Sequence, residues 1–232
     1  MKIVVAVLIA FLLGRPGWAQ SGSVWVEDYG ADALKATVAA GKTTLIYYGG
    51  SSPAVANHLA VARYVAQRVA DELTNALVLP IVPDGPEASG VVNRAIATGG
   101  FKNVMIMGDD GPPAGDMTLE SVARKLDLDW QTKGVRVYYI HAHEIRPGQG
   151  MTLNSDYLRR WAARTVLEGR RQAVEHYAEL LFVDGDHKWL RPDMIPPEDR
   201  AVVNPTLGKV LVETRVTSIL DQIRQRSPSH VR

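Results

Sequence analysis

Short apolar segments alternate with longer amphipathic segments along most of the chain. The short segments, at 43–48, 76–82, 103–107 and 135–140, are rich in β-branched and aromatic residues, which is typical of buried strands. Between the first two, residues 54–73 place apolar side chains on one stripe and charged ones on the other, which predicts a helix. Further helices are expected at 32–40, 88–97, 118–128 and 155–167, and from 205 onward. This alternation predicts an α/β fold, a three-layer α/β/α sandwich with a mainly parallel central sheet.

Several of these helices have residues that favour a helix end. Thr118 is a suitable N-cap for one of them, and Asn204 followed by Pro205 is a common start for the last. Gly41 and the pair Gly99 and Gly100 are expected to end two earlier helices.

The first twenty residues have the pattern of a secretory signal peptide. Lys2 precedes an apolar run of about 11 residues, shorter than the roughly 20 that a membrane-spanning helix needs. We expect cleavage after Ala19, so that 1–19 is a signal peptide and 20–232 a single domain that is periplasmic or secreted. An uncleaved N-terminal membrane anchor is the alternative, because Gly17, Trp18 and Ala19 form an imperfect cleavage site.

Charge and cysteine content restrict the possible partners and chemistry. With 26 Lys and Arg against 25 Asp and Glu, the chain lacks the basic excess that nucleic acid or an acidic membrane surface attracts. It has no cysteine, which excludes disulfides, thiolate metal ligands and a cysteine nucleophile. We therefore expect a small molecule or a protein as partner, with homo- or hetero-oligomers possible, no nucleic acid, and no stable membrane span after cleavage.

Several short blocks occur in an order known from one protein family. They are 24–28 (VWVED), 40–44 (AGKTT), 57–59 (NHL), 100–103 (GFKN), 190–193 (LRPD) and 203–206 (VNPT). In this order they resemble the creatininase family, particularly an exported subgroup, over most of 24–224. The resemblance implies a creatininase-like α/β/α sandwich and the activity of a metal-dependent amidohydrolase. In such an enzyme several Asp, Glu and His side chains converge on metal ions that activate a water and polarise an amide carbonyl.

The chain departs from the family where the metal ligands are expected. After the first predicted strand the family has Glu-Gln-His or Glu-Gln-Asn, whereas this chain reads GSSPAVA at 50–56, which leaves His58 as the metal-competent side chain there. After the third, the family's Gly-Asp-His-Gly-Gly becomes GDDGP at 108–112, so that Asp109 is kept and Asp110 replaces a histidine.

Two further family features are altered. A pocket-wall loop containing Phe-Pro-Gly-Thr is replaced by the short segment 83–87. The family's late His-Ala-Gly block corresponds to 173–180, where His176 and Glu179 lie at i, i+3 spacing. His58, Asp109, Asp110, His176 and Glu179 are thus the residual candidates for a metal site, and no catalytic residue can be assigned. We expect no bound metal or other cofactor, and zinc or manganese if the site is functional.

Other groupings carry weaker chemical signals. His141 and His143 share one face of a strand end by period two, a spacing that can chelate a metal but is more often a solvated strand end. Residues 184–187 (DGDH) lack the remaining ligands of a calcium loop and predict a turn. Ser51 and Ser52 lack the glycine spacing of a nucleophile elbow.

Three classes of function follow from the sequence. The first is a catalytically degenerate creatininase-like protein that binds a small molecule or a partner protein outside the cytoplasm. The second is an active amidohydrolase with a reduced metal site, acting on a cyclic or linear amide. The third is a structural subunit of a hetero-oligomer.

Overall fold

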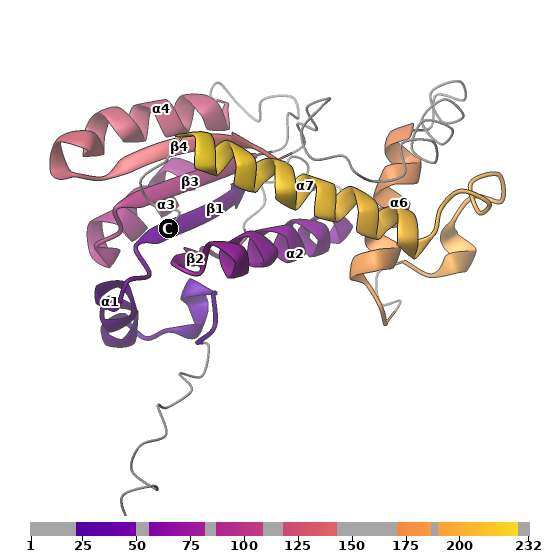
Figure 1. Ribbon diagram of the computed structural model, residues 1–232, viewed down its shortest axis with the longest axis horizontal. Coiled ribbons are helices and arrows are strands. Elements are labelled where there is room, and N and C mark those ends of the chain that lie inside the picture. Colours follow the sequence, from indigo (N-terminus) through magenta and orange to yellow (C-terminus); the bar gives the residue numbers. More distant parts are fainter. Residues whose placement is uncertain are drawn as a thin grey trace, which may run out of the picture.

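The computed structural model confirms the predicted fold class. It describes residues 22–49, 56–81, 87–108, 118–142, 171–186 and 190–226. Within them, β1 (Thr44–Gly49), β2 (Ala76–Val78), β3 (Asn103–Gly108) and β4 (Arg136–His141) form one sheet in which every pairing is parallel. The strand order is β2-β1-β3-β4. Helices cover both faces, which gives the α/β/α sandwich (Figure 1).

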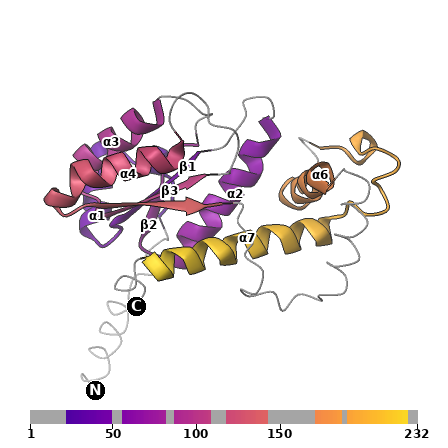
Figure 2. The same cartoon turned by 90° about the horizontal axis from the view of Figure 1, so that it is seen from above.

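Three of the helices in the described residues cover one face of the sheet. They are α1 (Ala31–Ala39), α3 (Glu87–Gly99) and α4 (Leu119–Trp130). Their side chains pack against Leu45, Tyr47, Val104 and Ile106, and Figure 2 shows α3 and α4 above the sheet with α7 below it. The predicted Thr118 cap is confirmed, since its side chain accepts a hydrogen bond from the Ser121 main chain.

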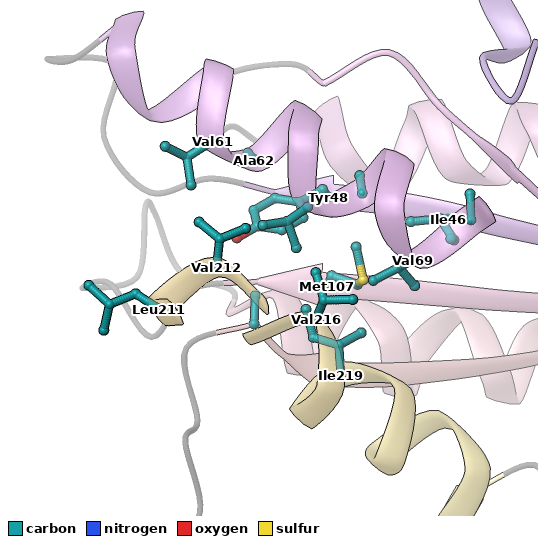
Figure 3. Packing of buried hydrophobic residues seen from close by; sticks show 14 of the residues in the cluster. Ile46, Tyr48, Val61, Ala62, Val69, Met107, Leu211, Val212, Val216 and Ile219 are labelled. Atoms are coloured by element: carbon teal, nitrogen blue, oxygen red, sulfur yellow. The ribbon is translucent and has the colours of Figure 1, made fainter. Parts of the chain in front are cut away.

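The other face is covered by α2 (Ala56–Leu73), α6 (Arg171–Val183) and α7 (Pro205–Arg226). Figure 3 shows side chains of α2 and α7, such as Val69 and Val216, meeting over Ile46, Tyr48 and Met107 of the sheet. Alternate residues of β1 and β3 therefore face opposite layers, and strands that are buried on both faces read as continuous apolar runs.

Helix α7 begins as the sequence predicts and crosses α6 closely. The main-chain N–H of Leu207 donates to the Asn204 side chain at 2.9 Å, and Pro205 follows that cap. At the crossing, a Cβ added to Gly208 would lie 1.9 Å from the main-chain oxygen of Ala178. Only glycine allows this close approach. The two helices cross beyond the carboxyl ends of the strands (Figures 1 and 2).

The outer edge of β4 is closed by side chains of α7. Gln222 accepts a hydrogen bond from the His141 N–H at 3.1 Å and donates one to the His141 carbonyl at 2.9 Å. Arg226, one turn later on α7, donates to the Tyr139 carbonyl. These groups would otherwise be open to pairing with another strand.

Asp127 of α4 binds the same outer edge of β4 nearer the start of the strand. Its carboxylate accepts the Val137 N–H at 2.8 Å and binds Arg136 through two bonds of 2.9 and 3.3 Å. The hydrogen bond and the negative charge of Asp127 raise the pKa of the Arg136 guanidinium above its ordinary value.

The opposite edge of the sheet is covered by the segment that precedes α1. Val78 of β2 donates its N–H to the Val24 carbonyl at 2.7 Å, and Trp25 forms a parallel bridge with Val78. The buried Trp25 ring lies 3.8 Å from the guanidinium of Arg63, which also pairs with Glu27 at 3.0 Å.

None of the helices in the described part of the chain is long and apolar enough to cross a membrane.

Candidate functional site

The carboxyl ends of β1, β3 and β4 lie side by side and form the edge at which a ligand is most readily bound. Gly49, Gly108 and His141, the last residues of these strands, are in register with one another. The chain leaves β1 toward β2 on one side and leaves β3 toward β4 on the other, so the strand order reverses between β1 and β3. Open α/β sheets bind ligands at such a reversal. We call the ends of these three strands the carboxyl edge.

Three of the candidate ligands follow this edge directly in the chain. Asp109 and Asp110 come immediately after Gly108 and lie outside the described residues. His58 lies in the first turn of α2, which begins at Ala56 shortly after β1 ends. The pairing of β1 with β3 therefore brings the start points of both segments together, and the positions of these three side chains are not part of the described structure.

The other two candidates lie on α6. Glu179 is buried, with 6% of its surface exposed, and it forms an ion pair with Arg215 of α7, which is equally buried. Its carboxylate therefore joins α6 to α7. His176 is half-buried, with its ring centroid 6.2 Å from that of Tyr177. Within the described residues, no three His, Asp or Glu side chains are grouped closely enough to hold a metal ion.

His141 is the imidazole that the described structure places on the carboxyl edge. Its ring meets the ring of Tyr139 edge-on, at 4.7 Å between centroids and 74° between planes. Its main-chain N–H and carbonyl, on the outer side of β4, are both bound by Gln222. His143, the second member of the predicted chelating pair, lies outside the described residues.

Leu119, at the start of α4, packs over the point where the strand order reverses. A Cβ on Gly49 or on Gly108 would lie 2.6 Å from its Cδ1 atom. On Gly108 the same Cβ would also lie 3.2 Å from the Tyr139 hydroxyl. Both glycines thus make room for Leu119, so the α4 side of the carboxyl edge is filled by side chains. Sequence analysis missed this role, although a glycine at the end of two neighbouring strands is a signal of close approach.

Two further sequence-based interpretations can be compared with the structure. Gly185 and Asp186 form the predicted turn, and the buried Asp184 side chain accepts the Leu190 N–H at 3.0 Å. A tryptophan is more often a packing anchor than a substrate platform, and Trp130 joins α4 to α3 by donating its indole N–H to the Asn93 side chain at 2.7 Å. His187, Ser51 and Ser52 lie outside the described residues.

Comparison with known proteins identifies no relative for this chain. A scan against protein-family models, a search of curated proteins and a search of solved structures each returned no match. The resemblance to the creatininase family therefore remains a prediction from sequence blocks, and the α/β/α sandwich is what the structure establishes.

Proposed function

We propose that this chain is an exported, creatininase-like protein that binds a small molecule or a partner protein at its carboxyl edge and does not hydrolyse amides. In this proposal the signal peptide 1–19 is removed, and the folded domain acts in the periplasm or outside the cell. The metal chemistry of the family is lost, and its scaffold is kept.

The ion pair between Glu179 and Arg215 carries the proposal. A carboxylate that binds a metal must point at a shared centre with other ligands. Glu179 instead neutralises a buried guanidinium, and both side chains have 7% of their surface exposed. Moving Glu179 to a metal would leave the Arg215 charge buried without that partner, which is strongly unfavourable.

The sequence of the segments after β1 and β3 gives further support. Ser52 and Pro53 stand where the family has a glutamate ligand, and Asp110 stands where it has a histidine. Loss of a first ligand and of a neutral nitrogen donor weakens a zinc or manganese site. Even changes to groups behind the ligands typically reduce metal affinity or activity by about 10- to 100-fold.

The proposal is tested by metal content and activity together. The protein is purified without chelator, metals are measured by mass spectrometry, and hydrolysis of creatinine and related cyclic amides is followed. We expect far less than one metal per chain and hydrolysis at the background rate. The same preparation gives the mass of the N-terminus, which we expect near Gln20; an intact Met1 in a cytoplasmic fraction would contradict export.

An active enzyme with a reduced metal site is the second candidate. It is favoured by the pairing of Gly49 with Gly108, because the segments carrying His58, Asp109 and Asp110 start beside each other. This candidate predicts near-stoichiometric metal that disappears in a His58→Ala, Asp110→Ala double variant. Asp186→Ala, in the exposed turn after α6, serves as the control. That result would overturn the binding proposal.

A further inference from the structure

A cleft lined by both polar and apolar side chains lies at the opposite end of the sheet from the carboxyl edge. It has a volume of about 370 Å³ and is bordered by three separate parts of the chain. Ser23 and Trp25 line it from the segment before α1, Lys42 from the residues just before β1, and Asp71 and Thr74 from the end of α2. This volume is at the lower end of the range for small-molecule sites. The creatininase resemblance assigns no role to this cleft.

The cleft contains two opposite charges that do not pair with each other. Lys42 is half-buried, Asp71 is exposed, and both line the cleft. Among the described residues, no ion pair involves Lys42 or Asp71, whereas nearby Arg63 of α2 is neutralised by Glu27. A ligand that carries both an ammonium and a carboxylate can therefore pair with Asp71 and Lys42 at the same time.

The end of α2 adds to the attraction for a positive group beside Asp71. The last carbonyls of a helix carry partial negative charge, and α2 has no basic residue in its last turn. Thr74 follows the helix with φ of 59°, a conformation that β-branched residues rarely adopt. The floor of the cleft includes Val24 and Trp25, both buried and apolar.

We propose that this cleft binds a small zwitterion of amino-acid size. The ammonium group of the ligand pairs with Asp71 at the end of α2, and its carboxylate pairs with Lys42. The alkyl part lies on the floor formed by Val24 and Trp25.

Calorimetric titration with L-leucine tests the proposal on the purified protein from which the signal peptide has been removed. We expect saturable binding with a Kd in the millimolar range or below. Leucinamide lacks the carboxylate and N-acetylleucine lacks the ammonium, so each should bind at least about tenfold more weakly, the loss expected when about 1.4 kcal/mol of interaction is removed. In two-dimensional NMR, leucine should shift the indole signal of Trp25 and the amide signals of Lys42 and Thr74.

Variants with neutral side chains of similar shape separate the two charges. Lys42→Gln and Asp71→Asn should each weaken leucine binding at least about tenfold. Asp71→Asn should not weaken the binding of N-acetylleucine, which has no ammonium to pair with Asp71. Lys125→Gln and Asp129→Asn, on the exposed surface of α4, are the matched controls and should leave binding unchanged.

Two results would overturn the proposal. One is the absence of saturable leucine binding. The other is binding that Lys42→Gln and Asp71→Asn leave unchanged, which would place the ligand elsewhere. Neither result bears on metal content or hydrolysis at the carboxyl edge, so this test and that of the proposed function fail independently.

Discussion

The side-chain amide of Gln222 binds the main chain of His141 as a neighbouring strand would. It accepts the His141 N–H and donates to the His141 carbonyl, at 3.1 and 2.9 Å. Gln222 is 3% exposed and His141 is half-buried, so both bonds are partly shielded from water. These two hydrogen bonds lie at the last residue of β4, and they prevent this part of the sheet edge from pairing with another chain.

Replacing Gln222 by alanine should reduce the free energy of unfolding by about 1–3 kcal/mol, because it leaves main-chain groups of the half-buried His141 without their partner. Gln222→Glu should lose at least as much stability as Gln222→Ala, since a buried carboxylate can accept the His141 N–H but cannot donate to the His141 carbonyl that it would face. Urea unfolding followed by circular dichroism measures the change. Gln67→Ala, at an exposed position of α2, is the control and should stay within about 0.5 kcal/mol. Equal effects at both positions would contradict the role assigned to Gln222.

Leu119 packs over Gly49 and Gly108, which predicts that these positions are coupled. Gly108→Ala should reduce the free energy of unfolding by about 1–3 kcal/mol, because the new methyl group would lie 2.6 Å from Leu119 Cδ1. Leu119→Ala alone creates a cavity, but in the double variant it makes room for the new methyl group. The double variant should therefore lose less stability than the sum of the two single variants. Additive losses in a double-mutant cycle would show that the two positions do not contact each other.

Strands and most helix ends could be predicted because local sequence determines them. The predicted strands 43–48 and 135–140 each begin and end one residue before β1 and β4, and the predicted strand 103–107 ends one residue before β3 does. The predicted strand 76–82 was too long, since β2 ends at Val78 and Pro80 has no N–H for the sheet. The predicted helix 155–167 lies outside the described residues.

The environment of Glu179 could not be read from local sequence. A charged residue on a helix suggests an exposed face or a ligand, because charged side chains are rarely buried unless they are paired. Its partner Arg215 is 36 positions later in the chain, and the two meet only because α6 crosses α7. The helix α6 itself was not predicted as a separate element. The edge contacts of Gln222 likewise depend on how α7 lies against β4.

The Glu179 and Arg215 pair should behave as a structural contact between helices. Glu179→Ala should reduce the free energy of unfolding by about 3–5 kcal/mol, because it leaves a buried guanidinium without its carboxylate. Replacing both residues by apolar ones, Glu179→Leu with Arg215→Met, should recover most of that loss. Urea unfolding of the single and double variants gives the coupling energy. A metal-binding Glu179 would instead show loss of metal in Glu179→Gln, with little change in the stability of metal-free protein.

Thr74 should be a position where substitution stabilises the protein. It follows Leu73 at the end of α2, its φ is 59°, and its N–H donates to the Ala70 carbonyl at 3.1 Å. This is the place where helices usually have glycine or asparagine, since the left-handed conformation is unfavourable by about 1–2 kcal/mol for other residues.

Thr74→Gly removes that strain. It also gives the unfolded chain more conformational freedom, which lowers the free energy of unfolding by about 0.5–1 kcal/mol. The free energy of unfolding should therefore rise by about 0.5–1 kcal/mol. Thr74→Asn, which tolerates this conformation, should act in the same direction without adding glycine's extra freedom. Thr74→Val keeps the β-branch and the strain, so it is the matched control and should give no gain. Urea midpoints with an unchanged slope for the glycine and asparagine variants would show that the folded state is affected. If both variants were less stable than the parent, the hydroxyl or methyl group of Thr74 would have to make contacts that outweigh its strained main chain.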